Sequence, residues 1–267
     1  MTLECKIGII GGSGQLGSAI AEGWLSGGSV RPENLWISNR SGRSSRFLSW
    51  PNVTFTTSNQ ELTDACDVIL LSVPPALTDT IAIAAPEKLV ISVMAGVSLE
   101  ALSQLTGTKR AVRAMSSPAA ALGLAYSPWF AAPGLSDDDR LFVSTLLSAC
   151  GSSDEVPEEN QIDVFTAITG PAPGFVAYFA DCMVKYALAN GVEPDVAVRA
   201  VKQLFLASGE IMSRDTVTPD TRVKETVDYA GTTAAGLVKL KELGVEGLIA
   251  EGLGASTARA RTIAQKV

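Results

Sequence analysis

The sequence predicts an α/β fold in two parts: a doubly wound parallel sheet in the N-terminal half, followed by an all-helical C-terminal domain. Short apolar runs alternate with helix-compatible segments up to about residue 156. A glycine-rich turn joins the first of these runs to a helix. After about Asp154 the strand signals vanish, and Ala-, Leu- and Val-rich stretches with helical spacing follow.

The N-terminal strands are predicted from short apolar runs. Residues 67–73 are apolar at nearly every position, which is typical of a central parallel strand buried on both faces. Helix-compatible segments lie between the runs, for example at residues 18–24 and 99–105. The predicted strands cover residues 6–10, 34–38, 53–56, 68–73, 89–93 and 109–114.

The C-terminal half is predicted to be helical throughout. The helical spacing covers residues 164–190, 194–212 and 232–266. Proline should bend or begin a helix in the first of these stretches, at Pro171 and Pro173, and should begin helices or turns at Pro194 and Pro219. We therefore expect one domain over residues 1–157 and a second over residues 158–267.

Composition excludes several classes of function. The net charge is −7, which argues against a broad nucleic-acid surface. The chain has no histidine and its four cysteines lack metal-ligand spacing, so no metal site is expected and general acid–base chemistry must use other groups. No signal peptide and no apolar run of membrane-spanning length is apparent, so we expect a cytoplasmic protein without membrane contact.

The strongest motif is the turn Gly-Ser-Gly-Gln-Leu-Gly after the first predicted strand. Gly12 is expected to allow the tight turn, Gly14 to let the backbone approach a pyrophosphate, and Gly17 to let the helix pack closely on the strand. Free amides and the dipole at the helix start would hold the anion. The motif predicts a Rossmann-type dinucleotide site; the alternative is a glycine-rich turn without a ligand. Its predicted contacts are Gly12, Ser13, Gly14, Gln15, Leu16 and Gly17.

The end of the second predicted strand indicates which dinucleotide binds. NAD-specific domains place Asp or Glu there for the ribose 2′-hydroxyl, but this chain has no carboxylate between Ser38 and Arg43. Guanidinium groups suit a 2′-phosphate, which a carboxylate would repel. The predicted cofactor is therefore NADP(H), held at Ser38, Asn39, Arg40 and Arg43; the alternative is a solvated surface loop.

Two later strand ends are candidates for the rest of the cofactor pocket. Val73 and Pro74 end the central strand, and Ala95 and Gly96 follow the next one. Ligands of open α/β sheets lie at the carboxyl ends of the strands, so these turns could line the nicotinamide or adenine pocket. They could equally serve only to stop the strands.

The order of motifs along the chain resembles the pyrroline-5-carboxylate reductase family. Each motif alone is weak, but together they span nearly the full length. The matching segments are residues 12–17, 38–40, 95–98, 113–115, 167–175, 190–194, 223–225 and 230–237.

The resemblance implies an NAD(P)-dependent oxidoreductase acting on C=N. Family members reduce a cyclic imine carboxylate to proline, in a site shared between two subunits. By the same resemblance, backbone amides of Gly231, Thr232 and Thr233 would bind the substrate carboxylate, and Thr233 and Thr169 would be the catalytic hydroxyls. The apolar tail helices predict a homodimer or a higher homo-oligomer.

Departures from the family pattern leave the substrate open. Ser116, Ser117, Pro118, Ala119 and Ala120 stand where the family usually has a Pro-Asn-Thr-Pro-Ala run. Asp228 and Tyr229 precede the Gly-Thr-Thr stretch and face either the pocket or solvent. The alternatives are therefore a reductase of another imine or of an oxo acid, and a non-catalytic NADP-binding homologue.

Overall fold

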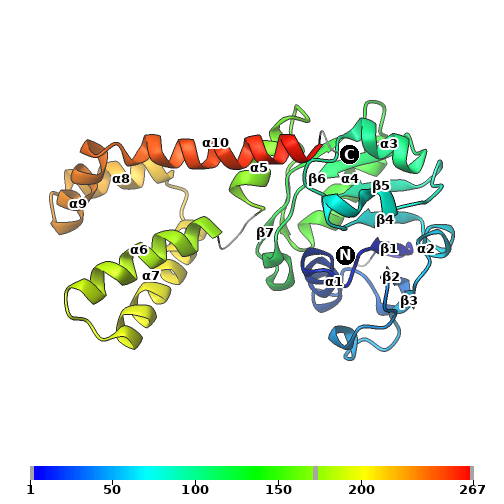
Figure 1. Ribbon diagram of the computed structural model, residues 1–267, viewed down its shortest axis with the longest axis horizontal. Coiled ribbons are helices and arrows are strands. Elements are labelled where there is room, and N and C mark those ends of the chain that lie inside the picture. Colours follow the sequence, from blue (N-terminus) through cyan, green and yellow to red (C-terminus); the bar gives the residue numbers. More distant parts are fainter. Residues whose placement is uncertain (1–2, 171–173, 265–267) are drawn as a thin grey trace. The chain divides into compact units, whose positions relative to one another are not determined.

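The computed structural model describes residues 3–170 and 174–264, which fall into two compact units (Figure 1). The sheet unit comprises Met1–Ala172 together with Leu253–Val267, and the helical unit comprises Pro173–Gly252. The last helix therefore begins in the helical unit and ends in the sheet unit. The domain boundary predicted between residues 157 and 158 stays a prediction.

The sheet unit is built on seven strands in the order β3-β2-β1-β4-β5-β6-β8. All neighbours are parallel except β6 and β8, which pair antiparallel. Every strand predicted from the sequence is present, and the fold class is confirmed. The bounds are β1 Ile7–Ile10, β2 Leu35–Ser38, β3 Thr54–Thr56, β4 Val68–Leu71, β5 Leu89–Ser92, β6 Ala111–Ala114 and β8 Trp129–Ala131. Two short strands, β7 Ala125–Tyr126 and β9 Gly151–Ser152, form a separate pair.

The strand order reverses at β1, and this fixes where a ligand can bind. Ile10 at the end of β1 pairs with Ser38 of β2 on one side and with Leu71 of β4 on the other. The loops after these three parallel strands therefore leave the sheet side by side, at the carboxyl ends of the strands. In open α/β sheets this reversal is where ligands bind.

The sheet is covered by helices that begin at well-defined caps. Ser58, Ser98 and Ser136 each accept a hydrogen bond from the amide three residues later, which satisfies an otherwise free N–H of the first turn. The helices of this part are α1 Gln15–Ser26, α2 Asn59–Ala65, α3 Leu99–Thr106, α4 Asp137–Ser148 and α5 Gln161–Ile168. Single 3-10 turns are η1 Pro32–Asn34, η2 Ser45–Phe47, η3 Pro75–Thr80 and η4 Pro118–Leu122.

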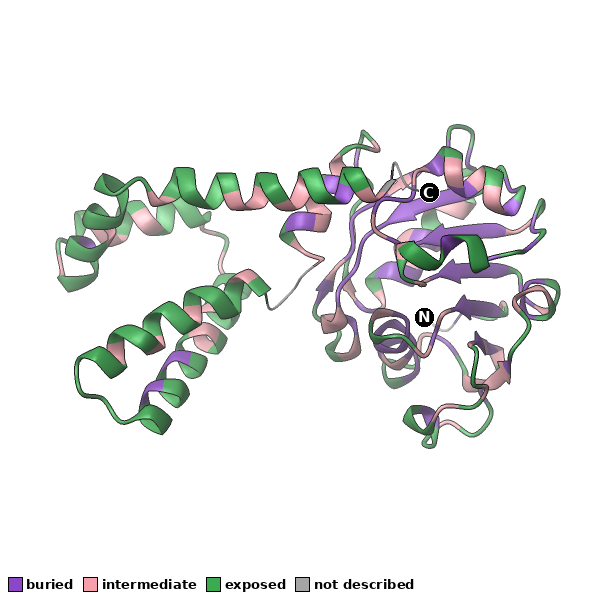
Figure 2. Ribbon diagram, viewed as in Figure 1, coloured by how far each residue is buried: buried purple, intermediate pink, exposed green. Residues whose placement is uncertain are grey.

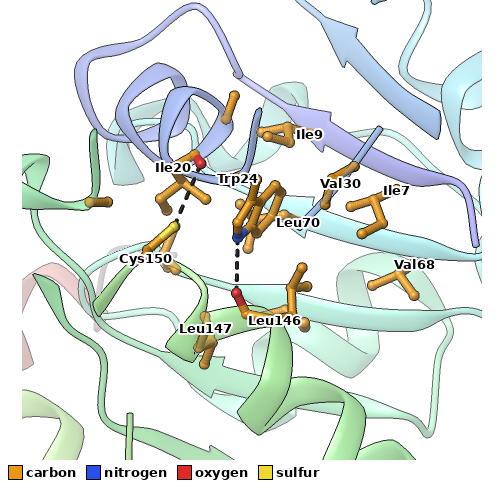
Figure 3. Close-up of a cluster of buried hydrophobic side chains, with 14 of the residues drawn as sticks. Ile7, Ile9, Ile20, Trp24, Val30, Val68, Leu70, Leu146, Leu147 and Cys150 are labelled. Atoms are coloured by element: carbon orange, nitrogen blue, oxygen red, sulfur yellow. Dashed lines mark hydrogen bonds between the residues drawn. The ribbon is translucent and has the colours of Figure 1, made fainter. Parts of the chain in front are cut away.

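Trp24 of α1 is the centre of one face of the core (Figure 3). Its side chain is fully buried, and its indole N–H donates to the carbonyl oxygen of Leu146 in α4 over 2.9 Å. Beside it, the Cys150 thiol lies 3.6 Å from the carbonyl oxygen of Ile20. The indole therefore satisfies a carbonyl in the last turn of α4 and joins α4 to α1.

The helical unit consists of α6 Gly174–Ala189, α7 Pro194–Arg214, α8 Pro219–Asp228, α9 Thr232–Glu242 and the start of α10 Val245–Ala264. Pro194 and Pro219 begin helices as predicted. The stretch predicted at 232–266 is not one helix, because Gly244 has φ +72° and separates α9 from α10. The stretch at 164–190 is also divided, into α5 and α6, and Pro171 and Pro173 lie outside the described residues.

Most side chains of the helical unit are exposed in the single chain (Figure 2). Among its described residues 174–252, only Ala197, Val201 and Ala234 are buried. Large apolar side chains such as Tyr178 and Tyr186 of α6 are 65% and 73% exposed. An apolar surface of this extent is typical of an association surface. Within the described residues, no helix has the length and apolar content needed to cross a bilayer.

Candidate functional site

In the described part of the chain, the turn after β1 gives the first turn of α1 no side-chain cap. The Gly14 amide donates to the carbonyl oxygen of Gly11 over 2.9 Å, and α1 then begins at Gln15. Gly14 is the N-cap and supplies no side-chain cap, so the amides of the first turn are available to a ligand. Bare amides at a helix start suit an anion, so this geometry is compatible with the anion site predicted from the sequence.

Gly11, rather than Gly12, supplies the unusual backbone of this turn. Its φ is +83°, whereas Gly12 does not have a positive φ. A Cβ on Gly12 would lie 2.9 Å from Cγ2 of Ile37, so Gly12 is needed for close packing of β1 against β2. The left-handed conformation of the turn therefore belongs to Gly11, which the glycine spacing alone could not indicate, and the role expected for Gly12 stays a prediction.

The other two glycines of the motif leave little or no room for a side chain. A Cβ on Gly17 would lie 2.8 Å from the carbonyl oxygen of Gly11, which is too close for any side chain. Gly14 is exposed, and a Cβ there would lie 3.2 Å from the same oxygen. The turn is thus an open cradle of bare backbone, and its shape and donors fit a dinucleotide pyrophosphate.

The loop after β2 is hydrogen-bonded to this turn. The Asn39 side-chain amide donates to the Ser13 hydroxyl over 2.5 Å, and its carbonyl oxygen accepts from the Ser41 amide over 3.0 Å. Ser38 is fully buried, and its hydroxyl donates to Asn59. Asn39 therefore aligns the loop beside the phosphate turn, on the β2 side of β1.

The two arginines of this loop differ in whether their guanidinium groups have a hydrogen-bond partner. The Arg43 guanidinium is exposed and donates to the carbonyl oxygen of Pro51 over 3.1 Å. Arg40 is also exposed, and its guanidinium has no partner among the described residues. Arg40 is therefore the cation that is available to an added phosphate.

On the other side of β1, a cavity of about 470 Å³ runs along the carboxyl ends of the strands. It begins at the phosphate turn and continues past the loops after β4, β5 and β6 to α5. Gly96 is buried behind Ala95 with φ +73° and is not part of the wall. The predicted residues that line the cavity are Gly14, Gln15, Leu16, Val73, Pro74 and Ala95.

The far end of this cavity was only partly predicted: Ser116 lies in a stretch that the family resemblance places near substrate or cofactor, but none of the residues there was named as a contact. Met115 and Ser116 follow β6, and Thr166 and Gly170 come from α5 and its end. Met115 could have been found, because it follows the carboxyl end of a parallel strand. Thr169 does not line the cavity, and its hydroxyl donates to the carbonyl oxygen of Phe165 over 3.0 Å.

The cavity wall contributed by the sheet unit is uncharged. None of the described residues that line it has a side chain that titrates near neutral pH. Its polar side chains include the hydroxyls of Ser72, Ser116 and Thr166, and the Ser116 hydroxyl accepts from Ser127 over 2.9 Å. Such a wall can hold a flat ring and exclude water, but it supplies no acid or base of its own.

The predicted substrate residues of the Gly-Thr-Thr stretch belong to the helical unit. Gly231 is the N-cap of α9 without a side-chain cap, so the amides of Thr232 and Thr233 at the start of the helix have no capping partner among the described residues. Ala230, just before them, has φ +55° and is the one non-glycine residue with a positive φ in the described part of the chain. Asp228 and Tyr229 are both exposed in the single chain.

Comparisons with known proteins agree with both parts of this description. Residues 159–263 match the family model described as pyrroline-5-carboxylate reductase dimerisation. Residues 6–96 match the model described as NADP oxidoreductase, coenzyme F420-dependent. A pyrroline-5-carboxylate reductase of Synechocystis is 27% identical over 270 residues, with 99% of this chain and 100% of the relative covered.

The chain belongs to the pyrroline-5-carboxylate reductase family. Among solved structures, the pyrroline carboxylate reductase of Plasmodium falciparum, with NADP bound, superposes with a TM-score of 0.84 at 22% identity and covers 99% of this chain and 100% of its own. A reductive aminase of Aspergillus terreus, in complex with NADPH and ethyl levulinate, gives a TM-score of 0.58 at 14% identity, over 100% of this chain and 95% of its own. At these identities both likenesses concern the fold. In this family, an NADP-binding sheet domain is followed by a helical dimerisation domain.

Proposed function

We propose that this chain is an NADPH-dependent reductase of a cyclic imine carboxylate, and that it forms L-proline from pyrroline-5-carboxylate. The observation that supports this most strongly is the uncharged cavity, which runs from the phosphate-binding turn along the ends of β4, β5 and β6. Family membership supports the same reaction class.

NADPH would lie across the end of β1. The turn at 12–17 would hold the pyrophosphate, and Arg40, with Ser38, Asn39 and Arg43, would hold the 2′-phosphate on the β2 side. The nicotinamide would then extend into the cavity on the β4 side, along Val73, Pro74 and Ala95. When bound, the cofactor supplies the hydride. The chain's own residues place the ring and exclude water.

The substrate would be bound mainly by backbone groups and hydroxyls. Free amides at the start of α9, at Thr232 and Thr233, suit a carboxylate, because the helix N-terminus carries partial positive charge. The Thr233 hydroxyl is the candidate donor to the imine nitrogen, and Thr169 is the second candidate. The uncharged wall of the sheet unit supports this assignment, because it offers no competing acid.

A homodimer or a higher homo-oligomer is part of the proposal. The exposed apolar side chains of α6 and α7 support it, as does the match to a dimerisation model over residues 159–263. By family resemblance, the substrate site would be shared between two subunits.

A substrate panel with both coenzymes tests the proposed reaction. The purified chain should oxidise NADPH in the presence of pyrroline-5-carboxylate and should release proline, with NADH much slower. Replacing Thr233 by Ala should lower kcat by on the order of 10²-fold or more, because a donor to the reacting nitrogen is lost. A chain that turns over no imine in the panel, with either coenzyme, would refute the proposal.

A second candidate is the reduction of another imine or of an oxo acid. The altered segments at Ser116, Ser117 and Asp228 favour it, since they stand in stretches that face substrate or cofactor in the family resemblance. In that case a six-membered imine carboxylate or an oxo acid would be the fastest substrate of the same panel. A non-catalytic homologue would instead bind NADPH tightly and reduce nothing.

A further inference from the structure

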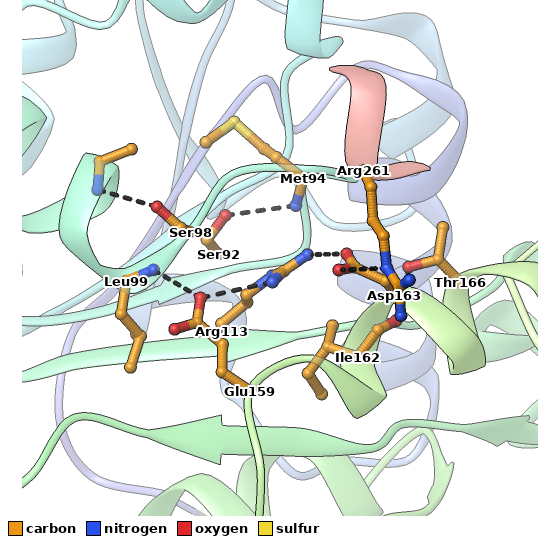
Figure 4. Close-up of polar contacts among 11 residues, drawn as sticks. Ser92, Met94, Ser98, Leu99, Arg113, Glu159, Ile162, Asp163, Thr166 and Arg261 are labelled. Carbon is orange, nitrogen blue, oxygen red and sulfur yellow. Dashed lines mark hydrogen bonds and ion pairs between the residues drawn. The ribbon is translucent and has the colours of Figure 1, made fainter. Parts of the chain in front are cut away.

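An ion cluster centred on the buried side chains of Arg113 and Asp163 joins β6 to α5 (Figure 4). Arg113 of β6 is 4% exposed; one end of its guanidinium pairs with Asp163, and the other lies 3.3 Å from Oε1 of Glu159. The second carboxylate oxygen of Asp163 lies 3.8 Å from Nε of Arg261, near the end of α10. Two cations thus face two carboxylates, as the burial of charge requires.

The cluster stands on the same elements as the far end of the cavity. Met115 follows Arg113 by two residues, so the two side chains leave the extended chain on the same face. Thr166 and Gly170 follow Asp163 by three and seven residues, which is one face of a helix. A Cβ on Gly170 would lie 3.3 Å from the sulfur of Met115, so there is little room for a side chain between these two parts of the wall.

Stability alone does not explain a cluster of this kind. Nε of Arg113 is buried and has no hydrogen-bond partner among the described atoms. Buried ion pairs often contribute nothing over apolar side chains of similar volume, because desolvation offsets the attraction. An ion pair has defined directions and distances, however, and apolar contacts do not. Glu159 also connects the cluster to a third element, α3. Its Oε1, which faces Arg113, accepts a hydrogen bond from the Leu99 amide at the start of α3 over 2.9 Å.

We propose that Arg113 and Asp163 are positioning residues, whose ion pair sets the spacing between Met115 and Thr166 and so seats the nicotinamide ring. This inference rests on the proposed NADPH-dependent reaction. The phosphate turn lies between β1 and α1, and among the described residues no ion pair or hydrogen bond of the cluster reaches these two elements. The pair should therefore act on ring placement and leave the hold on the phosphates intact. A misplacement of about 1 Å costs on the order of 10²-fold in rate.

Two variants test the inference. Asp163→Asn keeps the shape of the side chain but removes the negative charge that faces Arg113. The double variant Arg113→Met with Asp163→Leu replaces the pair by apolar side chains, which such sites tolerate without unfolding. Both should lower kcat at least ten-fold while the calorimetric Kd for NADPH stays within three-fold of the parent. The emission maximum of bound NADPH should also shift toward that of free NADPH, because the ring is less enclosed.

The matched control is the ion pair at the opposite end of β6. Arg110 and Asp139 form a two-bond pair, with Nη2 to Oδ1 at 2.6 Å, at the amino end of the strand and away from the cavity. Asp139→Asn removes the same kind of partner. This variant should keep kcat within two-fold of the parent. The emission maximum of its bound NADPH should equal that of the parent within experimental error.

The outcomes separate this inference from the proposed function. If the folded double variant keeps the parent's kcat and emission maximum, the positioning role is refuted. It is also refuted if NADPH affinity falls in parallel with kcat, since the effect would then not be confined to the ring. If the parent reduces no imine at all, the proposed function fails, and the emission of bound NADPH still decides whether the pair places the ring.

Discussion

At the scale of single residues, the site depends on bare backbone and on one free cation. The cradle after β1 exists because Gly14 and Gly17 have no side chains that would fill it. Beside it, Asn39 ties the loop after β2 to Ser13, and this leaves Arg40 exposed and unpaired in the described part of the chain. The selectivity for a 2′-phosphate should therefore be concentrated in Arg40.

Arg40→Gln tests that selectivity. A charge-assisted hydrogen bond contributes about 1.5–3 kcal/mol, so the Kd for NADPH should rise by roughly 10- to 100-fold, with that for NADH unchanged. Arg43→Gln is the matched control and should change the NADPH Kd by less, because Arg43 is engaged with Pro51. Calorimetry with both coenzymes measures the effect. An equal loss of NADH and NADPH affinity in Arg40→Gln would contradict a 2′-phosphate contact.

Ala230 carries backbone strain directly before the predicted substrate amides. Its φ of +55° is a left-handed conformation, which costs a side-chain-bearing residue about 1–2 kcal/mol. Ala230→Gly should therefore stabilise the fold by about 0.5–1 kcal/mol, after allowing for the added freedom of glycine in the unfolded chain. Ala235→Gly, inside α9, should instead destabilise by about 1 kcal/mol. Urea denaturation measures both, and a destabilising Ala230→Gly would show that the residue is unstrained.

At the scale of elements, the central parallel strands β1, β4 and β5 were predictable because each is a short, mainly apolar run that is buried along its whole length. The antiparallel β8 was missed, since three residues around Trp129 are too few to show a period. The phosphate turn was predictable because its glycines have a fixed spacing. Thr166 could not be chosen over Thr169, because which side of α5 faces the cavity depends on how Asp163 meets Arg113.

The buried thiol of Cys150, which lies against Ile20 of α1, predicts that the stability of the fold depends on pH. Burial raises the pKa of the Cys150 thiol from 9.0 to about 12. Below pH 9 both the folded and the unfolded chain keep this proton. Between pH 9 and 12 only the unfolded chain releases it, so the free energy of unfolding should fall as the pH rises. Urea midpoints from pH 8 to 11 measure the fall, and Cys150→Ala should make it shallower. An identical slope in parent and variant would contradict the shift.

At the scale of the whole molecule, the two units differ in how much of their apolar surface is exposed to solvent. The sheet unit buries its apolar strands and contains the described cavity, whereas the helical unit exposes large side chains along α6 and α7. Such a surface requires a partner in water. We expect sedimentation at micromolar concentration to give at least twice the 27.8 kDa mass of one chain. A stable species of 27.8 kDa would exclude a site shared between subunits.

Binding of the coenzyme to the sheet unit underlies every step of the proposed reaction. Calorimetric titration of the purified chain with NADPH, and separately with NADH, measures it without assuming a substrate. One NADPH should bind per chain with micromolar affinity or tighter, at least ten-fold tighter than NADH. Absence of binding by either coenzyme at millimolar concentration would contradict the function proposed for this chain.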